Sequence, residues 1–272
     1  MVPSSQLPPF ETLKVEHHGP SVLVMAFNRP TQMNAMVPES YREWRQVMEH
    51  VHATPKVRVL VITGKGPAYS AGQALVDAKS EDSEVIRRRC DVTRELTRLL
   101  VTSPIPIIAA VNGPAIGYGC TTLGLFDLVL ASESALFRTP FAELAFSAEG
   151  CSSVTFPRIL GPATANDMLL FGRTMSAREM HQRGFVARLA KPEELMPLAI
   201  KLARQLASRP QEAIRTSRSL LRTKEYVDEL VRVNDLEMDH FYRCLISDDA
   251  RQAISHMMAR LRAKRSNTKP KM

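Results

Sequence analysis

Two short apolar segments, each followed by a glycine-containing turn and a helical pattern, constrain the fold of this chain most. They span residues 57–64 and 107–111, and Arg58 is their only charged residue. Strands with so few charges, alternating with helices, are typical of α/β proteins whose sheets are covered on both faces. The sequence therefore predicts an α/β fold.

Weaker patterns predict the elements around these segments. Alternating apolar residues over 11–27, split by His18-Gly19-Pro20, predict a hairpin. A helix with Pro38 in its first turn should follow, and further helices should begin near residues 83 and 152. From residue 197 onward the pattern is only helical, over 197–207, 210–224, 225–245 and 248–263. We expect a flexible lead (1–10), an α/β core (11–196), a C-terminal helical oligomerisation region (197–265) and a basic tail (266–272).

Composition excludes several classes of protein. With 272 residues and 44% hydrophobic content, the chain is long enough for one large core. No apolar run is long enough to span a bilayer, and residues 1–10 lack the pattern of a secretory signal. The four cysteines and seven histidines have no ligand spacing. We therefore expect reduced thiols and no metal site.

The net charge of +8 is concentrated at one end of the chain. Residues 251–272 contain seven of the Lys and Arg residues and no acid. Three hypotheses stay open: cations that suit the negative end of a helix dipole, help in holding an anionic ligand such as a nucleotide phosphate, and nucleic-acid binding. The segment has no interleaved aromatic residues, so we expect no nucleic-acid partner.

The turns after the two apolar segments are candidate anion sites. Gly64-Lys65-Gly66 lacks the spacing of a phosphate-binding loop, and Gly117-x-Gly119 lacks the third glycine of a dinucleotide fingerprint. Small residues at 70–72, and a helix opening within 112–120, can instead aim backbone N–H groups at a developing anion. The alternative is a pair of ordinary strand-to-helix turns.

Several motifs together resemble the crotonase (enoyl-CoA hydratase/isomerase) superfamily over residues 11–265. They are Asn28-Arg29-Pro30 with Asn34-Ala35, then Tyr69–Gly72, Val111–Gly117 and Phe126-Asp127. The resemblance implies a crotonase-like spiral of ββα units with a C-terminal helical region, assembled as trimers or hexamers. It also implies an acyl-CoA substrate, with CoA as part of the substrate and no cofactor. The N–H groups of Ala71 and Tyr118 would hold the thioester oxygen, and the implied substrate neighbours are Arg29, Ser70, Ala71, Gly72, Gln73, Ala74, Leu75 and Gly117.

The acidic residues indicate which member of the superfamily this chain resembles. Hydratases of the family use two glutamates, and the equivalent positions here hold Thr121 and Phe141. Residues 148–153, with Pro140-Phe141 and Phe156-Pro157, are similar to peroxisomal-type Δ3,Δ2-enoyl-CoA isomerases, although Ala148 replaces their usual proline. That similarity makes Glu149 the sole acid/base. One carboxyl suffices because isomerisation moves a proton from C2 to C4 and consumes no water. We expect burial to raise its pKa; the alternative is a helix-entry acid.

These motifs predict an isomerase that converts 3-enoyl-CoA to trans-2-enoyl-CoA in the β-oxidation of unsaturated fatty acids. Alternatives are a non-catalytic acyl-CoA-binding scaffold on the same fold, an enoyl-CoA hydratase and a dienoyl-CoA isomerase. The C-terminal Pro270-Lys271-Met272 is similar to the S-K-L peroxisomal address, apart from its proline. We expect a peroxisome or related organelle, or otherwise the mitochondrial matrix or cytoplasm.

Overall fold

The computed structural model describes residues 7–75 and 82–267, with side chains described as far as residue 261. Most of the predicted basic tail and the C-terminal tripeptide lie outside the described residues, as do the first six residues of the lead. The three hypotheses for the basic segment 251–272 therefore stay open.

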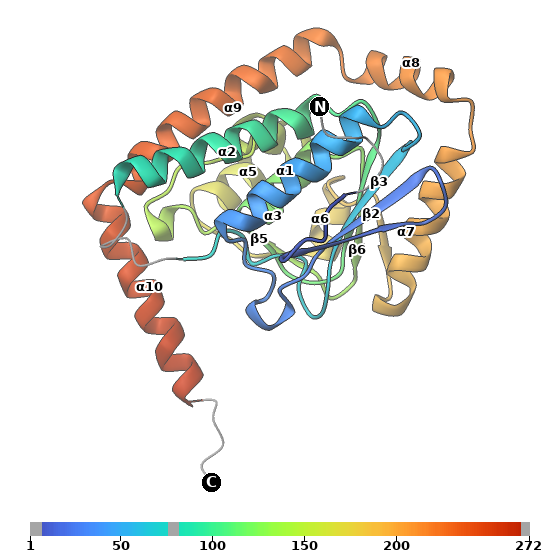
Figure 1. Cartoon of the computed structure of the whole chain (residues 1–272). Coiled ribbons are helices and arrows are strands. Elements are labelled where there is room, and N and C mark those ends of the chain that lie inside the picture. Colours follow the sequence, from blue (N-terminus) through green and yellow to red (C-terminus); the bar gives the residue numbers. More distant parts are fainter. Residues whose placement is uncertain (1–6, 76–81, 268–272) are drawn as a thin grey trace.

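A six-stranded sheet forms the centre of the fold (Figure 1). Its first two strands are the predicted hairpin, which pairs antiparallel, and all later neighbours pair parallel. β2 and β4 are buried along their whole length, as expected for strands covered on both faces. In sheet order the strands are β1 (Leu13–His17), β2 (Val22–Phe27), β3 (Val59–Gly64), β4 (Ile107–Val111), β6 (Leu128–Ser132) and β9 (Arg188–Ala190).

A smaller sheet lies beside the two predicted turns, and one of its strands, β5 (Ala115–Ile116), belongs to the second turn. Its other strands are β7 (Leu136–Arg138) and β8 (Met175–Ser176). A bridge between Ser70 and Ala115 ties the loop after β3 to β5. The sequence did not predict β8 or β9, because strands of two and three residues are too short to show a period of two.

Helices cover both faces of the main sheet (Figure 1). α1 and α2 pack on one face, where Trp44 is fully buried. α7 packs on the other face through Leu195, Ala199 and Ala203. The predicted boundary between residues 196 and 197 falls inside α7, which belongs to the sheet by its packing. The helices before the C-terminal region are α1 (Pro38–Ala53), α2 (Ser83–Val101), α3 (Tyr118–Thr121), α4 (Ser152–Leu160), α5 (Pro162–Leu169), α6 (Ala177–Gln182) and α7 (Pro192–Ala207), with short 3-10 turns at Pro30–Gln32, Thr122–Leu125 and Ala142–Leu144.

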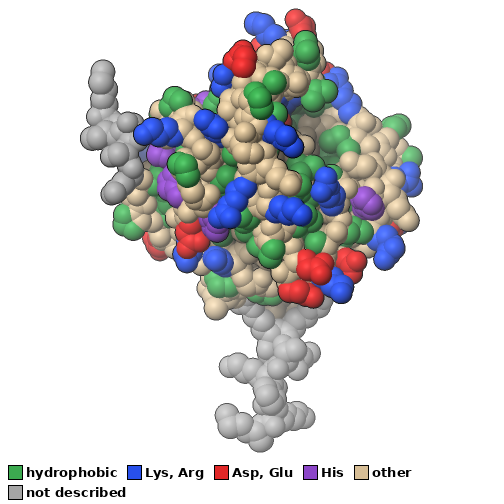
Figure 2. Space-filling model, turned by 90° about the vertical axis from the view of Figure 1, so that its right-hand side faces the viewer, with side chains coloured by type: hydrophobic (Ala, Val, Ile, Leu, Met, Phe, Trp, Pro, Cys, Tyr) green, Lys and Arg blue, Asp and Glu red, His purple; other side chains and the backbone are tan. Residues whose placement is uncertain are grey.

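Three helices, α8 (Gln211–Leu221), α9 (Lys224–Leu245) and α10 (Asp248–Asn267), complete the chain. α9 lies along α2 (Figure 1), joined to it by an ion pair between Arg94 and Asp239 at 2.6 Å. α10 extends away from the body. Lys and Arg side chains are spread over the face that carries α7 and α8 (Figure 2). Within the described ranges, no helix is both long and apolar enough to cross a membrane.

Candidate active site

The two predicted turns meet at a pair of glycines. Gly72 (φ +75°) follows β3, and Gly117 (φ +53°) follows β5 and precedes α3. A Cβ atom on Gly72 would stand 2.6 Å from the carbonyl oxygen of Ile116. Only glycine tolerates both this conformation and this approach. The backbone amides that follow the two glycines therefore lie on adjoining strands of chain.

The Ala71 amide is already occupied. Its N–H donates to the carbonyl oxygen of Met33 at 2.9 Å. An amide has one hydrogen, so the assignment of Ala71 as an oxyanion donor is not supported. The next free candidate is Gln73, whose N–H has no hydrogen-bond partner among the described residues, while its neighbours Gly72 and Ala74 both donate.

Tyr118 begins α3 immediately after Gly117. Its N–H also has no partner within the part of the chain that the structure describes, as expected for the first amide of a helix. The buried side chain is anchored by a 2.8 Å hydrogen bond between its hydroxyl and that of Thr97. It also packs against Tyr41, with ring centroids 5.4 Å apart.

The other predicted binding residues have mixed positions. Ser70 is buried and structural, since its hydroxyl donates to the Asn34 carbonyl at 2.9 Å and accepts from the Gly72 N–H. Arg29 donates to the carbonyl oxygen of Ala35 at 2.5 Å and so ties its own loop together. Ala74 and Leu75 are half-buried at the end of the described part of this loop.

Glu149 lies in the turn before α4 and is 3% exposed. The turn is tight, because Gly150 and Cys151 both have positive φ values, +66° and +61°. The Glu149 carboxyl has no hydrogen bond to any side chain or amide in the described ranges. Burial, reinforced by the negative charge of Glu237, raises its pKa to about 8. The predicted effect of desolvation is confirmed.

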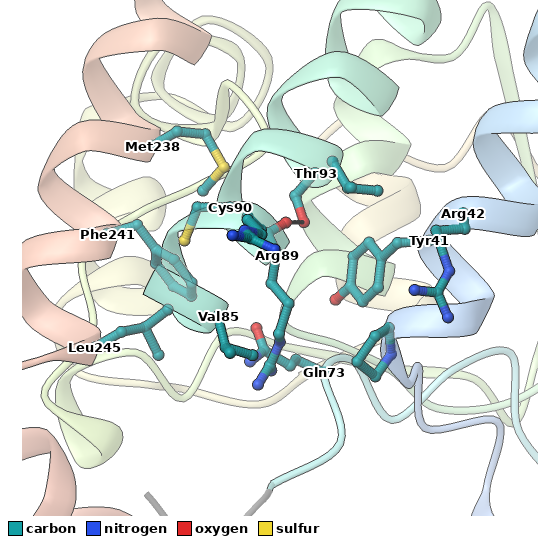
Figure 3. Close-up of a pocket in the computed structure, with 13 residues that line it drawn as sticks. Tyr41, Arg42, Gln73, Val85, Arg89, Cys90, Thr93, Met238, Phe241 and Leu245 are labelled. Atoms are coloured by element: carbon teal, nitrogen blue, oxygen red, sulfur yellow. Dashed lines mark hydrogen bonds between the residues drawn. The ribbon is translucent and has the colours of Figure 1, made fainter. Parts of the chain in front are cut away.

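An apolar cavity of about 290 Å³ lies between α1, α2 and α9 (Figure 3). Tyr41 enters it from α1, Cys90 from α2, and Phe241 and Leu245 from α9. Gln73 also lines it. Its remaining lining residues are Pro38, Arg42, Val85, Arg88, Arg89, Val92, Thr93 and Met238.

Glu149 is not among the residues that line this cavity, but its charge acts on two that are. Its charge contributes to the raised pKa values of Tyr41 and Cys90, after burial as the main cause. Phe146, from the segment before Glu149, packs on Phe241 with ring centroids 5.1 Å apart. The carboxyl, the Gln73 loop and the apolar cavity therefore belong to one site.

The positions of the two missing hydratase acids are filled by buried, un-ionisable side chains. Thr121 and Phe141 are 0% and 3% exposed. Thr121 packs beside the Glu149 turn, because a Cβ atom on Gly150 would stand 2.6 Å from its hydroxyl oxygen. Glu143 pairs with Arg138 at the surface. No group of residues suited to a metal ion occurs in the described ranges.

Two residues of the site were not singled out from the sequence. Tyr41 has helical spacing with Trp44 and was indistinguishable from a core residue. Glu237 lies among charged residues of α9 and looked like part of a solvated face. The one signal in the sequence is that Glu237 occupies a position of the α9 helical period where apolar residues are expected.

Comparison with known proteins agrees with this geometry. The family model described as enoyl-CoA hydratase/isomerase matches residues 17–265. The chain belongs to this family. The crotonase-like fold class is also confirmed by a solved enoyl-CoA hydratase/isomerase from Pseudoalteromonas atlantica T6c. Its TM-score is 0.83 at 30% identity, and the match covers 92% of this chain and 98% of that one.

Two curated relatives of this chain have names that describe isomerases. Human enoyl-CoA delta isomerase 2 is 34% identical over 261 residues, which cover 92% of this chain and 64% of the relative. Mouse peroxisomal enoyl-CoA delta isomerase 3 is 38% identical over 165 residues, 60% of this chain and 52% of the relative. The chain thus spans between about half and two thirds of the length of these curated relatives.

Proposed function

We propose that this protein is a Δ3,Δ2-enoyl-CoA isomerase that converts 3-enoyl-CoA to trans-2-enoyl-CoA. One observation carries the proposal: Glu149 is a buried carboxyl with a raised pKa, and its charge acts on Tyr41 and Cys90 of the apolar cavity. The positions of both hydratase acids hold Thr121 and Phe141 instead. Hydration needs an activated water and a separate proton donor, whereas isomerisation needs one group that alternates between base and acid.

The oxyanion hole in this proposal consists of the amides of Gln73 and Tyr118. Both lack a partner among the described residues, and each follows one glycine of the Gly72–Gly117 contact. The thioester oxygen would accept both N–H groups as its charge develops. One such donor typically contributes about 2.7–4 kcal/mol to the transition state. Gln73 thus takes the role first expected of Ala71.

The proton path follows from these positions. The Glu149 carboxylate removes a proton from C2, and the electron pair moves onto the thioester oxygen as the enolate. The neutral Glu149 carboxyl then returns the proton at C4, the double bond forms between C2 and C3, and the carboxylate is regenerated. Nothing else is consumed, so the reaction needs no cofactor. A base with a raised pKa is better matched to a weak carbon acid than an ordinary carboxylate.

The assembly and location remain part of the proposal. A homotrimer or hexamer is the assembly expected for the family, and sedimentation of the purified chain tests it. A peroxisome or related organelle is the proposed location. Support comes from the name of the mouse relative and from the C-terminal Pro270-Lys271-Met272, which lies outside the described residues. Imaging of tagged chains with and without the last three residues tests this location.

Glu149→Gln is the direct test of the mechanism. It keeps the shape of the side chain and removes the acid/base, so turnover of a 3-enoyl-CoA should fall about 10²–10⁴-fold. Glu143→Gln is the matched control, because Glu143 pairs with Arg138 at the surface and should leave turnover unchanged. Near-normal turnover by Glu149→Gln would remove Glu149 from the mechanism. Binding of acyl-CoA by the unaltered protein without turnover would favour the scaffold alternative.

A further inference from the structure

A second buried carboxyl, Glu237, lies beside Glu149. It belongs to α9 and is 6% exposed. Its Oε2 atom accepts the Cys151 N–H at 2.6 Å, and its Oε1 atom accepts the Ser153 N–H at 2.9 Å. Both amides belong to the start of α4, directly after the Glu149 turn. One side chain of α9 therefore holds the backbone that presents Glu149.

Helix α4 depends on this external carboxylate. Its own N-cap residue, Cys151, has a positive φ and makes no side-chain capping bond. The Cys151 thiol instead donates to the Leu230 carbonyl of α9 at 3.4 Å. The first amides of a helix need acceptors and favour a negative charge. Glu237 supplies both from a distant part of the chain.

The two carboxyls have different surroundings. Burial raises the pKa of both, but three hydrogen-bonding contributions from Ser153 and Cys151 oppose this rise at Glu237. No such bond opposes it at Glu149, where the charge of Glu237 adds to the rise. Two neighbouring acids in unequal surroundings share protons unequally. The hydrogen bonds to Glu237 favour the charge on Glu237 and the proton on Glu149.

We infer that Glu237 is a positioning residue of the active site, which fixes the Glu149 turn through two amides and keeps a negative charge beside Glu149 so that Glu149 carries the proton. The inference rests on the proposed role of Glu149 as acid/base. It assigns to α9 a part in the chemistry, besides the cavity wall that Met238, Phe241 and Leu245 of the same helix supply.

The buried tyrosines and thiols around the two carboxyls do not change charge near neutral pH. Burial is the first cause that raises the pKa of the tyrosines and thiols here, and Cys90 reaches about 12. Guanidinium groups keep their charge throughout. The tyrosines and thiols are Tyr41 of α1, Cys90 of α2, Tyr118 of α3 and Cys151 before α4, and the charged groups that act on them include Arg89, Asp91 and Arg94 of α2, Arg222 before α9 and Asp235 of α9.

Glu237→Gln tests the inference through the pH dependence of kcat/KM with a 3-enoyl-CoA. Removing the charge should move the inflection of Glu149 to lower pH by roughly one unit. Glu229→Gln is the matched control, because Glu229 also joins α9 to α4, through Arg158 at 2.7 Å, but does not contribute to the Glu149 shift. Its inflection should not move. An unmoved inflection in Glu237→Gln, with only a loss of stability, would make Glu237 a structural cap and overturn the inference.

A second measurement needs neither activity nor the Glu237 variant. Infrared difference spectra of the unaltered protein, recorded below and above the inflection, should show one buried neutral carboxyl that ionises as pH rises. That signal should be absent in Glu149→Gln. Its persistence there would place the proton on Glu237 and overturn the inference. This readout does not use turnover. A failed isomerase assay would therefore refute the proposed function, whereas the infrared signal would still show which of the two carboxyls carries the proton.

Discussion

Gly72 lies so close to Ile116 that a Cβ atom on the glycine would stand 2.6 Å from the Ile116 carbonyl oxygen. The loop after β3 and the turn before α3 are held together at this point, and the bridge between Ser70 and Ala115 keeps them in register. The Gln73 amide follows Gly72, and the Tyr118 amide follows Gly117, the residue next to Ile116. Their separation therefore depends on this contact.

Gly72→Ala should displace the Gln73 amide. A methyl group at this position meets backbone atoms, which cannot rotate away, and the φ of +75° is itself unfavourable for alanine. We expect kcat/KM for a 3-enoyl-CoA to fall by about 10²–10³, the usual loss for one oxyanion donor. Steady-state assays of the folded variant measure the effect.

Gly19→Ala is the control for backbone strain alone. Gly19 has a φ of +84°, but a Cβ atom there would meet nothing within 4 Å. It should lower the melting temperature while leaving kcat/KM near that of the unaltered protein. Equal losses of activity in both variants would show that the Gly72–Ile116 contact has no special role.

The activity should rise with pH and level off above about 8. The carboxylate form of Glu149 removes the C2 proton, and burial followed by the charge of Glu237 raises the pKa of this group to about 8. A plot of log kcat/KM against pH should therefore climb through the neutral range and flatten at alkaline pH. A profile that is already flat at pH values well below neutrality would contradict the raised pKa.

Stability should depend on Glu149 with the opposite sign. Its pKa is higher in the folded state, about 8 against 4.5, so the folded protein binds more protons between these values. The free energy of unfolding should therefore fall as pH rises from about 4.5 to 8. At about 1.4 kcal/mol per unit, the cost at alkaline pH is on the order of 5 kcal/mol.

Urea denaturation of Glu149→Gln measures this cost. The variant should gain stability over the unaltered protein as pH rises toward about 8, because it has no charge to bury. Glu143→Gln, a surface change, should follow the unaltered protein at each pH. A constant difference between Glu149→Gln and the unaltered protein would show that Glu149 does not titrate in this range.

The predictable parts of the fold are those with strong local patterns. The β1–β2 hairpin, α1 with its early Pro38, and β4 all occupy the predicted segments. β2 and β4 are continuous apolar runs, and the buried residues of α1 recur at helical spacing, so short windows of sequence suffice. β9 is different, because three residues that begin with the exposed Arg188 become a strand only by pairing with β6. No window of local sequence contains that partner.

The site shows the same division. Glu149 and the meeting of the loops around Gly72 and Gly117 followed from motifs. The free amide of Gln73 did not follow from motifs. It depends on where the Met33 carbonyl lies, because that carbonyl accepts the N–H of Ala71 and not that of Gln73. Glu237 reaches the Glu149 turn from a helix far along the chain. The spacing of residues within α9 can show that Glu237 is buried, but it cannot show which distant segment Glu237 contacts.

The apolar cavity should limit the length of the acyl chain. Leu245 and Phe241 of α9 line it, and the cavity measures about 290 Å³. Leu245→Trp should fill part of this space, so that long 3-enoyl-CoA chains lose contacts while short chains keep theirs. Each excluded methylene should cost about 0.8 kcal/mol, or roughly a fourfold loss in kcat/KM.

Leu236→Trp is the control for this change. Leu236 lies on the same helix α9 but is 59% exposed and does not line the cavity. A series of 3-enoyl-CoA substrates of increasing chain length separates the two variants: kcat/KM should fall with length in Leu245→Trp alone. A uniform loss at every length would mean that the acyl chain lies elsewhere, because a filled cavity affects only the carbons that would have entered it.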